Sequence, residues 1–354
     1  MDMAGDSHTV LAFIDAPDPD NFVLLIAIAK LFPNATMHVI LTGRPVRFKA
    51  TREHQHWDYD RASSIMAQEA SAARIKNFLR HFGVTVVRVY DGGIAPRTLV
   101  PHWLHFRDYY QFLDADPLAA IRYSDLDGQE EFVKALMLVD HCDVVVGGPM
   151  TGLAQLITRH PAIAPKIREV HAMFATWGNI QLMQLDTQKD APPRGALQFN
   201  VACDPVAAHQ VLMGLDCPIY LMPSEVTRDS RIGFQNAVEL REALPQNNGS
   251  RQLHMLYAIW YDAAVAPRQA KNPEEKIFIH DVVAALSLDP ELRTQIYDVV
   301  PINIPSVPHL ARDAADWGKI LMSETTGSTK HFAAKGLKPD GAKVYLDTLR
   351  RVFA

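Results

Sequence analysis

The sequence predicts an α/β protein with a mostly parallel open sheet and helices on both faces. Short apolar runs alternate with longer segments of helical pattern as far as about residue 222, as in consecutive βαβ units. Glycine-containing or acidic turns follow several of these runs, where the carboxyl ends of parallel strands would meet. The chain has 354 residues, of which 48% are hydrophobic and 21% charged, enough for one large domain. We therefore expect a single domain over 1–354, with its core at about 10–310.

The expected strands are short apolar runs rich in β-branched residues. They cover 10–14, 37–41, 84–90, 142–146, 169–174, 219–222 and a strand-rich piece at 297–304. The expected helices have helical periodicity or an apolar run of helical length, and Gly83 suits the end of the second one. They cover 21–31, 62–82, 129–139, 150–158, 204–213, 235–263, 280–288 and 343–353. The stretches 94–127 and 228–275 are expected as irregular or helical additions around a site.

Composition limits the function classes. A formal net charge of -5 argues against nonspecific binding to nucleic acid or to a membrane surface. The three cysteines form no CxxC pair, which excludes a thiolate zinc site and a disulfide framework. No apolar stretch is long enough to span a bilayer, and no signal peptide is recognisable. We expect a cytoplasmic protein without nucleic-acid or membrane partners.

An acidic turn follows the first strand. It carries Asp15, Asp18, Asp20 and Asn21 directly before an apolar helix. Oxygen ligands in a tight turn suit Ca²⁺ or Mg²⁺, and a sheet of this kind binds ligands at this edge. The alternative is that Asp20 or Asn21 caps the helix while Asp18 faces its positive end.

Other polar residues are expected at the same edge of the sheet. These are Arg44 after the second strand, Thr151 in a glycine-rich turn, Gln198 and Asn200 before a helix, and the pair His280 and Asp281 at the start of another helix. Asp281 suits a cation, and a histidine can donate a proton near neutral pH. For Thr151 and for the His280–Asp281 pair, capping of a helix is the alternative.

The order of these motifs resembles the nucleoside hydrolase family, the inosine-uridine-preferring N-ribohydrolases. The family's DxDPGxDD turn, GPLTN turn, EFN segment with its DPxAA helix, and HDPLA helix have counterparts in the same order. They begin here at Asp15, Gly148, Gln198 and His280. The resemblance covers about residues 10 to 310. It implies a Ca²⁺-dependent hydrolase of N-glycosidic bonds in nucleosides, commonly a homo-oligomer, with a small ribosyl substrate.

The resemblance also implies roles for individual residues. Asp18, Asn21, the backbone carbonyl of Thr151 and Asp281 would hold the ion. Asp18 would take a proton from the attacking water, and His280 would help protonate the leaving base. Asp20, Gln198, Asn200 and Arg44 would lie against the substrate, and Asp15 would begin the turn.

Departures from the family pattern open alternatives. The aspartate turn is one residue shorter, Asn21 stands where an aspartate is usual, and Arg44 replaces an asparagine. Fewer carboxylates weaken Ca²⁺ binding, so weak or absent calcium is expected. One alternative is a catalytically impaired relative that binds a ligand or partner or has a structural role. Another is metal-independent chemistry on an anionic ribosyl phosphate, with Arg44 binding the phosphate.

Overall fold

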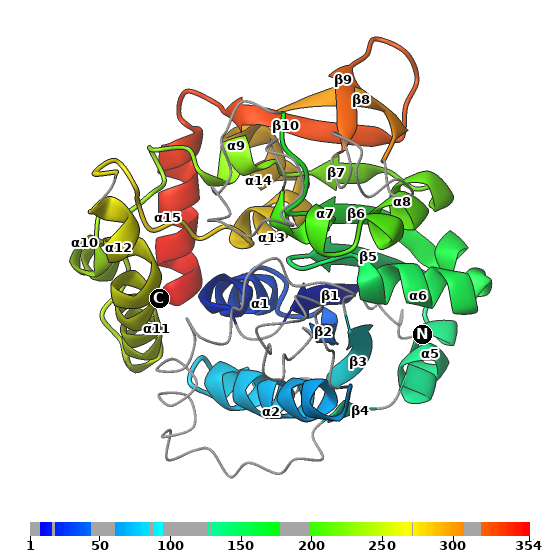
Figure 1. The fold of residues 1–354 in the computed structure, drawn as a ribbon, viewed down its shortest axis with the longest axis horizontal. Helices are drawn as coiled ribbons and strands as arrows, with labels where there is room; N and C mark the ends of the chain where they lie inside the picture. Colours follow the sequence, from blue (N-terminus) through cyan, green and yellow to red (C-terminus); the bar gives the residue numbers. More distant parts are fainter. Residues whose placement is uncertain are drawn as a thin grey trace, which may run out of the picture.

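The computed structural model describes residues 8–15, 18–43, 61–84, 88–94, 126–127, 129–177, 198–270, 272–307 and 320–354. Their strands form a ten-stranded sheet in the order β4-β3-β2-β1-β5-β6-β7-β10-β8-β9 (Figure 1). Neighbouring strands from β4 to β10 run parallel, whereas β10 pairs with β8 and β8 with β9 in antiparallel fashion. The predicted fold class, a mostly parallel sheet with helices on both faces, is confirmed.

The strands match most of the predicted apolar runs. They are β1 Thr9–Asp15, β2 Thr36–Gly43, β3 Arg88–Ile94, β4 Leu126–Asp127, β5 Cys142–Val146, β6 Ile167–Ala172, β7 Ile219–Leu221, β8 Tyr297–Ser306, β9 Leu321–Glu324 and β10 His331–Leu337. The strand expected at 84–90 begins and ends four residues later, at Arg88 and Ile94.

The helices surround the sheet. They are α1 Pro19–Leu31, α2 Arg61–Arg80, α5 Gln129–Met137, α6 Thr151–Arg159, α7 Phe199–Cys203, α8 Pro205–Gly214, α9 Ser224–Thr227, α10 Ala237–Ala243, α11 Asn248–Trp260, α12 Ala266–Gln269, α13 Val282–Leu288, α14 Pro290–Ile296 and α15 Gly341–Phe353. A 3-10 helix, η1, covers Pro161–Lys166, and a π-helical turn, η2, covers Tyr261–Val265.

Alternate residues of β1 enter two hydrophobic cores, because successive side chains of a strand point to opposite faces. Val10, Ala12 and Ile14 pack in the larger core, together with residues of α1, α2, α11, α13 and α15. Leu11 and Phe13 pack in the other core, with residues of α5, α6 and α8. The central strand is therefore buried on both faces, which fits its uninterrupted apolar sequence.

The C-terminal part differs most from the prediction. The sheet extends past residue 310, because β10 lies between β7 and β8. The last helix, α15, packs against α1 and α14. The single helix expected at 235–263 is two helices, α10 and α11, separated around Pro245, which cannot donate a helical hydrogen bond. Additions around the site were expected at 94–127 and 228–275. Residues 95–125 of the first lie outside the described residues. The segment 228–275 consists largely of helices.

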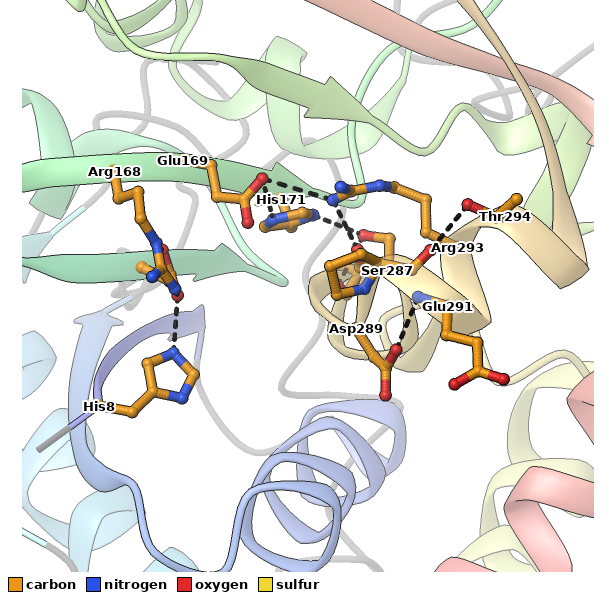
Figure 2. A network of polar contacts seen from close by, with 12 residues as sticks. His8, Arg168, Glu169, His171, Ser287, Asp289, Glu291, Arg293 and Thr294 are labelled. Carbon is orange, nitrogen blue, oxygen red and sulfur yellow. Dashed lines mark hydrogen bonds and ion pairs between the residues drawn. The ribbon is translucent and has the colours of Figure 1, made fainter. Parts of the chain in front are cut away.

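A buried charge is compensated at the opposite, amino-terminal edge of the sheet. Asp143 on β5 is fully buried and lies 2.6 Å from His8 Nε2. It also accepts hydrogen bonds from Nε of Arg168 at 2.9 Å and from its Nη2. Figure 2 shows His8, which directly precedes β1, next to Arg168 of β6. This pairing holds β1, β5 and β6 together far from the acidic turn.

Within the described ranges, no helix has both the length and the hydropathy that crossing a bilayer requires.

Candidate active site at the carboxyl edge of the sheet

The acidic turn and the glycine-rich turn lie next to each other because β1 and β5 are neighbouring parallel strands. The N–H of Gly147 donates to the carbonyl of Phe13 at 2.8 Å, which continues the pairing beyond β5. A β-carbon on Gly148 would lie 2.8 Å from the backbone nitrogen of Asp15 and 3.0 Å from its Cβ. Only glycine fits so close to Asp15, so the GGP turn is required for this contact.

Asn21 is buried, and the orientation of its side-chain amide is fixed by Asp15. Its Nδ2 donates to the backbone carbonyl of Asp15 at 3.0 Å and to Oδ1 of Asp15 at 2.8 Å. Both partners are acceptors, so only the NH₂ group can face them. Among the described residues, Oδ1 of Asn21 has no hydrogen-bond partner. The site therefore contains a buried oxygen that is ready to accept a bond.

Asp281 lies beside this oxygen, although it comes from the start of α13. A β-carbon on Gly147 would stand 2.8 Å from Asn21 Oδ1 and 3.2 Å from the carboxyl carbon of Asp281. Asp281 occupies the N-cap position of α13 without a side-chain capping bond. The capping interpretation of Asp281 is therefore wrong, and its carboxylate is directed to the edge of the sheet near Asn21.

Asn200 and Gln198 bind the end of β6. Nδ2 of Asn200 donates to the carbonyl of Gly147 at 3.1 Å and to that of Met173 at 3.2 Å. Nε2 of Gln198 lies 3.2 Å from Sδ of Met173, and its Oε1 caps α7 by accepting from the N–H of Val201 at 3.0 Å. The donors of Asn200 serve two backbone carbonyls, which leaves its oxygen as the atom that can accept from a ligand.

Asp18 and Asp20 behave differently from the capping interpretation. Asp18 is the N-cap residue of α1, but its side chain makes no capping bond, and Asp20 and Asn21 lie inside the first turn of the helix. Burial raises the pKa of Asp20 well above its usual value, and the nearby carboxyl groups of Asp18 and Asp15 raise it further. The backbone N–H groups of Asp20 and His280 partly offset this shift. Asp20 therefore lies between the acidic turn and the start of α13.

His280 is held by Thr227 at the end of α9. Its Nδ1 lies 2.8 Å from Oγ1 of Thr227, which itself donates to the carbonyl of Ser224 at 3.3 Å. The threonine hydroxyl has one proton, so Nδ1 of His280 carries the hydrogen of this contact and Nε2 is an acceptor. Removal from water and the positive charges of Arg228 and Arg268 lower the pKa of His280 to about 3. At neutral pH the imidazole is therefore uncharged, which opposes the predicted role as proton donor.

Thr151 is the first residue of α6, after the N-cap residue Met150. Its hydroxyl donates to Oδ2 of Asp204 at 2.7 Å, and Oδ1 of Asp204 caps α8 by accepting from the N–H of Ala207. The side chain of Thr151 thus ties the glycine-rich turn to α8 rather than capping its own helix. Arg44, predicted to lie against the substrate, is outside the described residues.

A strained residue lies three positions after the end of β6. Ala175 has a φ of 75° and is almost fully buried. This left-handed conformation costs an alanine roughly 1–2 kcal/mol relative to the ordinary right-handed one. Its carbonyl accepts from the N–H of Ser224, the first residue of α9. The strained turn therefore joins the segment that carries Met173 to the one that carries Thr227.

The position of α13, and so of Asp281, is fixed by a buried polar network shown in Figure 2. Nδ1 of His171 on β6 lies 2.9 Å from Oγ of Ser287, which donates to the carbonyl of Ala284. Arg293 donates to the carbonyl of Ser287 at 3.0 Å and contacts Glu169 at 3.4 Å. The His171 ring also stacks on Tyr220, with 5.0 Å between centroids. The network anchors the far end of α13 to the sheet.

The described side chains of the site present mainly oxygen atoms that accept hydrogen bonds. Asn21 Oδ1, the carboxylates of Asp15 and Asp281, and the oxygen of Asn200 surround Gly147 and Gly148. Such a group suits hydroxyl donors or a hard cation. No three His, Cys, Asp or Glu side chains gather as a metal-binding group among the described residues. The residues present fit a cation through the unpartnered Oδ1 of Asn21 and the carboxylate of Asp281 beside it.

Several site residues escaped the sequence interpretation. Met173 and Thr227 orient the predicted residues, but neither carries a recognisable motif. Asp204 stands out in sequence only as a helix start before Pro205, a pattern that predicts its capping role but not its bond to Thr151.

Comparisons with known proteins show the family of the chain. The family model for the inosine-uridine preferring nucleoside hydrolases matches residues 66–336. The chain therefore belongs to the nucleoside hydrolase family. The matched segment includes Thr151, Asn200 and Asp281 but begins after the acidic turn. No curated protein matches the chain by sequence.

Solved structures share the fold at low identity. The inosine-uridine preferring nucleoside hydrolase from Bacillus anthracis has a TM-score of 0.61 and 14% identity, over 97% of this chain and 99% of its own. The purine-preferring ribonucleoside hydrolase from Gardnerella vaginalis has a TM-score of 0.68 and 15% identity, over 97% and 98%. The type III effector protein XopQ, complexed with adenosine diphosphate ribose, has a TM-score of 0.58 and 16% identity, over 99% and 95%.

Proposed function

We propose that this protein hydrolyses the N-glycosidic bond of a nucleoside or related ribosyl compound, releasing the base and ribose. The observation that carries the proposal is the group of acceptor oxygens that the described residues place around Gly147: Oδ1 of Asn21 and the carboxylate of Asp281 lie beside it, and Asn200 binds its carbonyl. Ribose offers two adjacent hydroxyl donors to such a site. Membership of the nucleoside hydrolase family supports the same reaction.

In this proposal, Asp20, Gln198 and Asn200 orient the ribose, and Asp18 takes a proton from the attacking water. The water oxygen bonds to the anomeric carbon as the bond to the base nitrogen breaks, through an oxocarbenium-like state. The departing base takes up one proton from the solvent. His280 lies against the leaving group as a neutral imidazole, since its pKa of about 3 leaves it uncharged in the free protein.

A Ca²⁺ ion fits the same proposal. Asn21 Oδ1 and Asp281 would hold it, with Asp18 and the carbonyl of Thr151 as further ligands. When bound, such an ion orients sugar hydroxyls and lowers the pKa of a water molecule. Because Asn21 contributes no charge, we expect weak calcium binding.

The test is release of free base from a panel of purine and pyrimidine nucleosides, with and without added Ca²⁺, followed by chromatography. Wild-type protein is expected to release base, and Asp281→Asn to lose the activity. Thr294→Ala is a suitable control, since Thr294 lies on the exposed side of α14 and only bonds the carbonyl of Pro290. No release by the wild type from any member of the panel would contradict the proposal.

A second candidate is a relative that binds a ribosyl ligand without cleaving it. Two observations favour it: the uncharged Asn21 beside Asp281, and the pKa of His280, which opposes proton donation. The structural neighbour XopQ was solved with adenosine diphosphate ribose. Calorimetric binding of a nucleoside that is recovered intact after prolonged incubation would favour this candidate over the hydrolase.

We also propose that the protein is a cytoplasmic homo-oligomer, on the basis of its resemblance to the family. Light scattering coupled to gel filtration tests the oligomeric state. A monomeric mass across a tenfold range of protein concentration would contradict it.

A further inference from the structure

Two arginines share one glutamate beside the candidate site. Nη2 of Arg228 contacts both carboxylate oxygens of Glu275, at 3.0 and 3.1 Å. Nε of Arg268 lies 3.6 Å from Oε1 of the same carboxylate. Both contacts of Arg228 use Nη2. Within the described part of the chain, Nε and Nη1 of Arg228 therefore stay available to donate hydrogen bonds to a ligand. The open edge of a guanidinium suits a phosphate group.

The arrangement is built into the fold rather than formed by flexible surface side chains. Nε2 of Gln269, next to Arg268, donates to the carbonyls of Glu275 and Gln235, each at 2.7 Å. Oε1 of Gln269 accepts from the hydroxyl of Tyr261 at 2.7 Å, across the π-helical turn η2. These bonds fix α12 against the segment that carries Glu275. π-Helical turns are often found at functional sites.

Arg228 adjoins His280 in two ways. It directly follows Thr227, whose hydroxyl holds the imidazole at 2.8 Å. Its guanidinium carbon also lies 5.7 Å from the centre of the Phe278 ring, and this ring lies 5.8 Å from that of His280. A ligand that contacts His280 therefore comes close to Arg228.

We propose that the site takes a ribosyl compound that carries a phosphate group, with Arg228 as the residue that binds the phosphate and Arg268 as a second positive charge beside it. This inference rests on the proposed function, because it places the ribose at the acceptor site around Gly147. It assigns the phosphate to two arginines of the described structure, whereas Arg44, the residue suggested by sequence, lies outside the described residues. Glu275 holds both arginines in the free protein and competes with the phosphate.

The test compares the binding of adenosine, adenosine 5′-monophosphate and adenosine diphosphate ribose by calorimetry at low salt. The two phosphorylated ligands are expected to bind at least about tenfold more tightly than adenosine, the gain of one charge-assisted hydrogen bond. The difference between them shows whether a monoester or a pyrophosphate is preferred. Arg228→Gln is expected to remove the advantage of both, while adenosine binds as in the wild type.

Arg231→Gln is the matched control, because Arg231 lies three residues away and pairs with Asp229 at 2.8 Å. It is expected to keep the wild-type preference. Glu275→Gln removes the competing carboxylate and is expected to strengthen phosphate binding, an effect that a merely structural ion pair would not produce.

Equal affinity for adenosine and its monophosphate, or an unchanged preference in Arg228→Gln, would overturn the inference while leaving the proposed function intact. Tight binding of the monophosphate without release of base would overturn the proposed hydrolysis but support the inference. Failure of all three ligands to bind would overturn the inference for adenine compounds, while release of base from another nucleoside of the panel would keep the proposed function.

Discussion

Asn21 and Asp281, 260 positions apart in the chain, come together beside Gly147. The amide oxygen of Asn21 and the carboxyl carbon of Asp281 lie 2.8 and 3.2 Å from the point where a β-carbon of Gly147 would stand. The glycine therefore sets the spacing between the two oxygen groups. This spacing depends on the pairing of β1 with β5 and on the anchoring of α13.

Gly147→Ala is expected to separate these two groups. The added methyl group would force them apart at a cost of about 1–3 kcal/mol in the free energy of unfolding, and ligand binding would weaken. Denaturant titration and calorimetry measure the two effects. Gly214→Ala is the control, since nothing lies within 4 Å of its β-carbon position, and it should leave both unchanged. Wild-type binding by Gly147→Ala would argue against the site.

Asn21→Asp should make folding depend on a cation. A carboxylate at this position would face the carbonyl and the carboxylate of Asp15 with no hydrogen to donate, which costs about 1–3 kcal/mol. A bound Ca²⁺ ion would offset the repulsion. We expect the variant to melt below the wild type in chelator and to gain more from added Ca²⁺. Identical responses of both proteins to Ca²⁺ would mean that no cation binds there.

Ala175 gives a test of backbone strain. Ala175→Gly should relieve the strain of the left-handed conformation. Glycine also adds entropy to the unfolded chain, so the net gain in the free energy of unfolding should be roughly 0.5–1 kcal/mol. Ala175→Val, with a branched β-carbon at the same φ, should unfold more easily than the wild type. Thermal melts of the two variants check the order, and a valine variant as stable as the glycine variant would refute the strain.

His171 should make stability depend on pH. Burial lowers the pKa of His171, so the folded protein resists a proton that the unfolded chain accepts near pH 6.5. The buried, neutral His171 therefore contributes fully to the free energy of unfolding above pH 6.5. This contribution declines as the pH falls, by up to about 1.4 kcal/mol per pH unit. His171→Gln should therefore be clearly less stable than the wild type at pH 7.5, with the gap closing towards pH 5.

Ser287→Ala is the control for that measurement. It removes the same 2.9 Å contact but keeps the imidazole, so it should follow the wild-type pH dependence at a lower stability. A constant gap between His171→Gln and the wild type across this pH range would contradict the assigned burial effect.

The sequence was most informative where one strand is buried on both faces. The run at 142–146 is apolar almost throughout, and β5 has the same bounds. In contrast, β10 reads HFAAKGL, a short mixed segment with an exposed lysine and a glycine, so neither alternation nor an apolar run marks it. Its place in the sheet depends on distant contacts with β7 and β8.

The site follows the same division. Motif order placed Asp15, Asn21, Asn200 and Asp281 together, and the structure brings them around Gly147 and Gly148. Sequence alone could not predict three of the contacts. Met173 acts through its backbone carbonyl, Thr227 through its hydroxyl, and Arg228 forms an ordinary ion pair with Glu275. Such contacts are set by the tertiary fold and leave no local pattern in sequence.

We expect the oxygens around Gly147 to accept hydrogen bonds from the hydroxyl groups of a ribose. The most direct measurement compares the binding of adenosine with that of 2′,3′-dideoxyadenosine by calorimetry. We expect adenosine to bind and the dideoxy compound to bind at least about tenfold more weakly, since it leaves buried acceptors unpaired. Equal affinities for the two compounds would contradict the account.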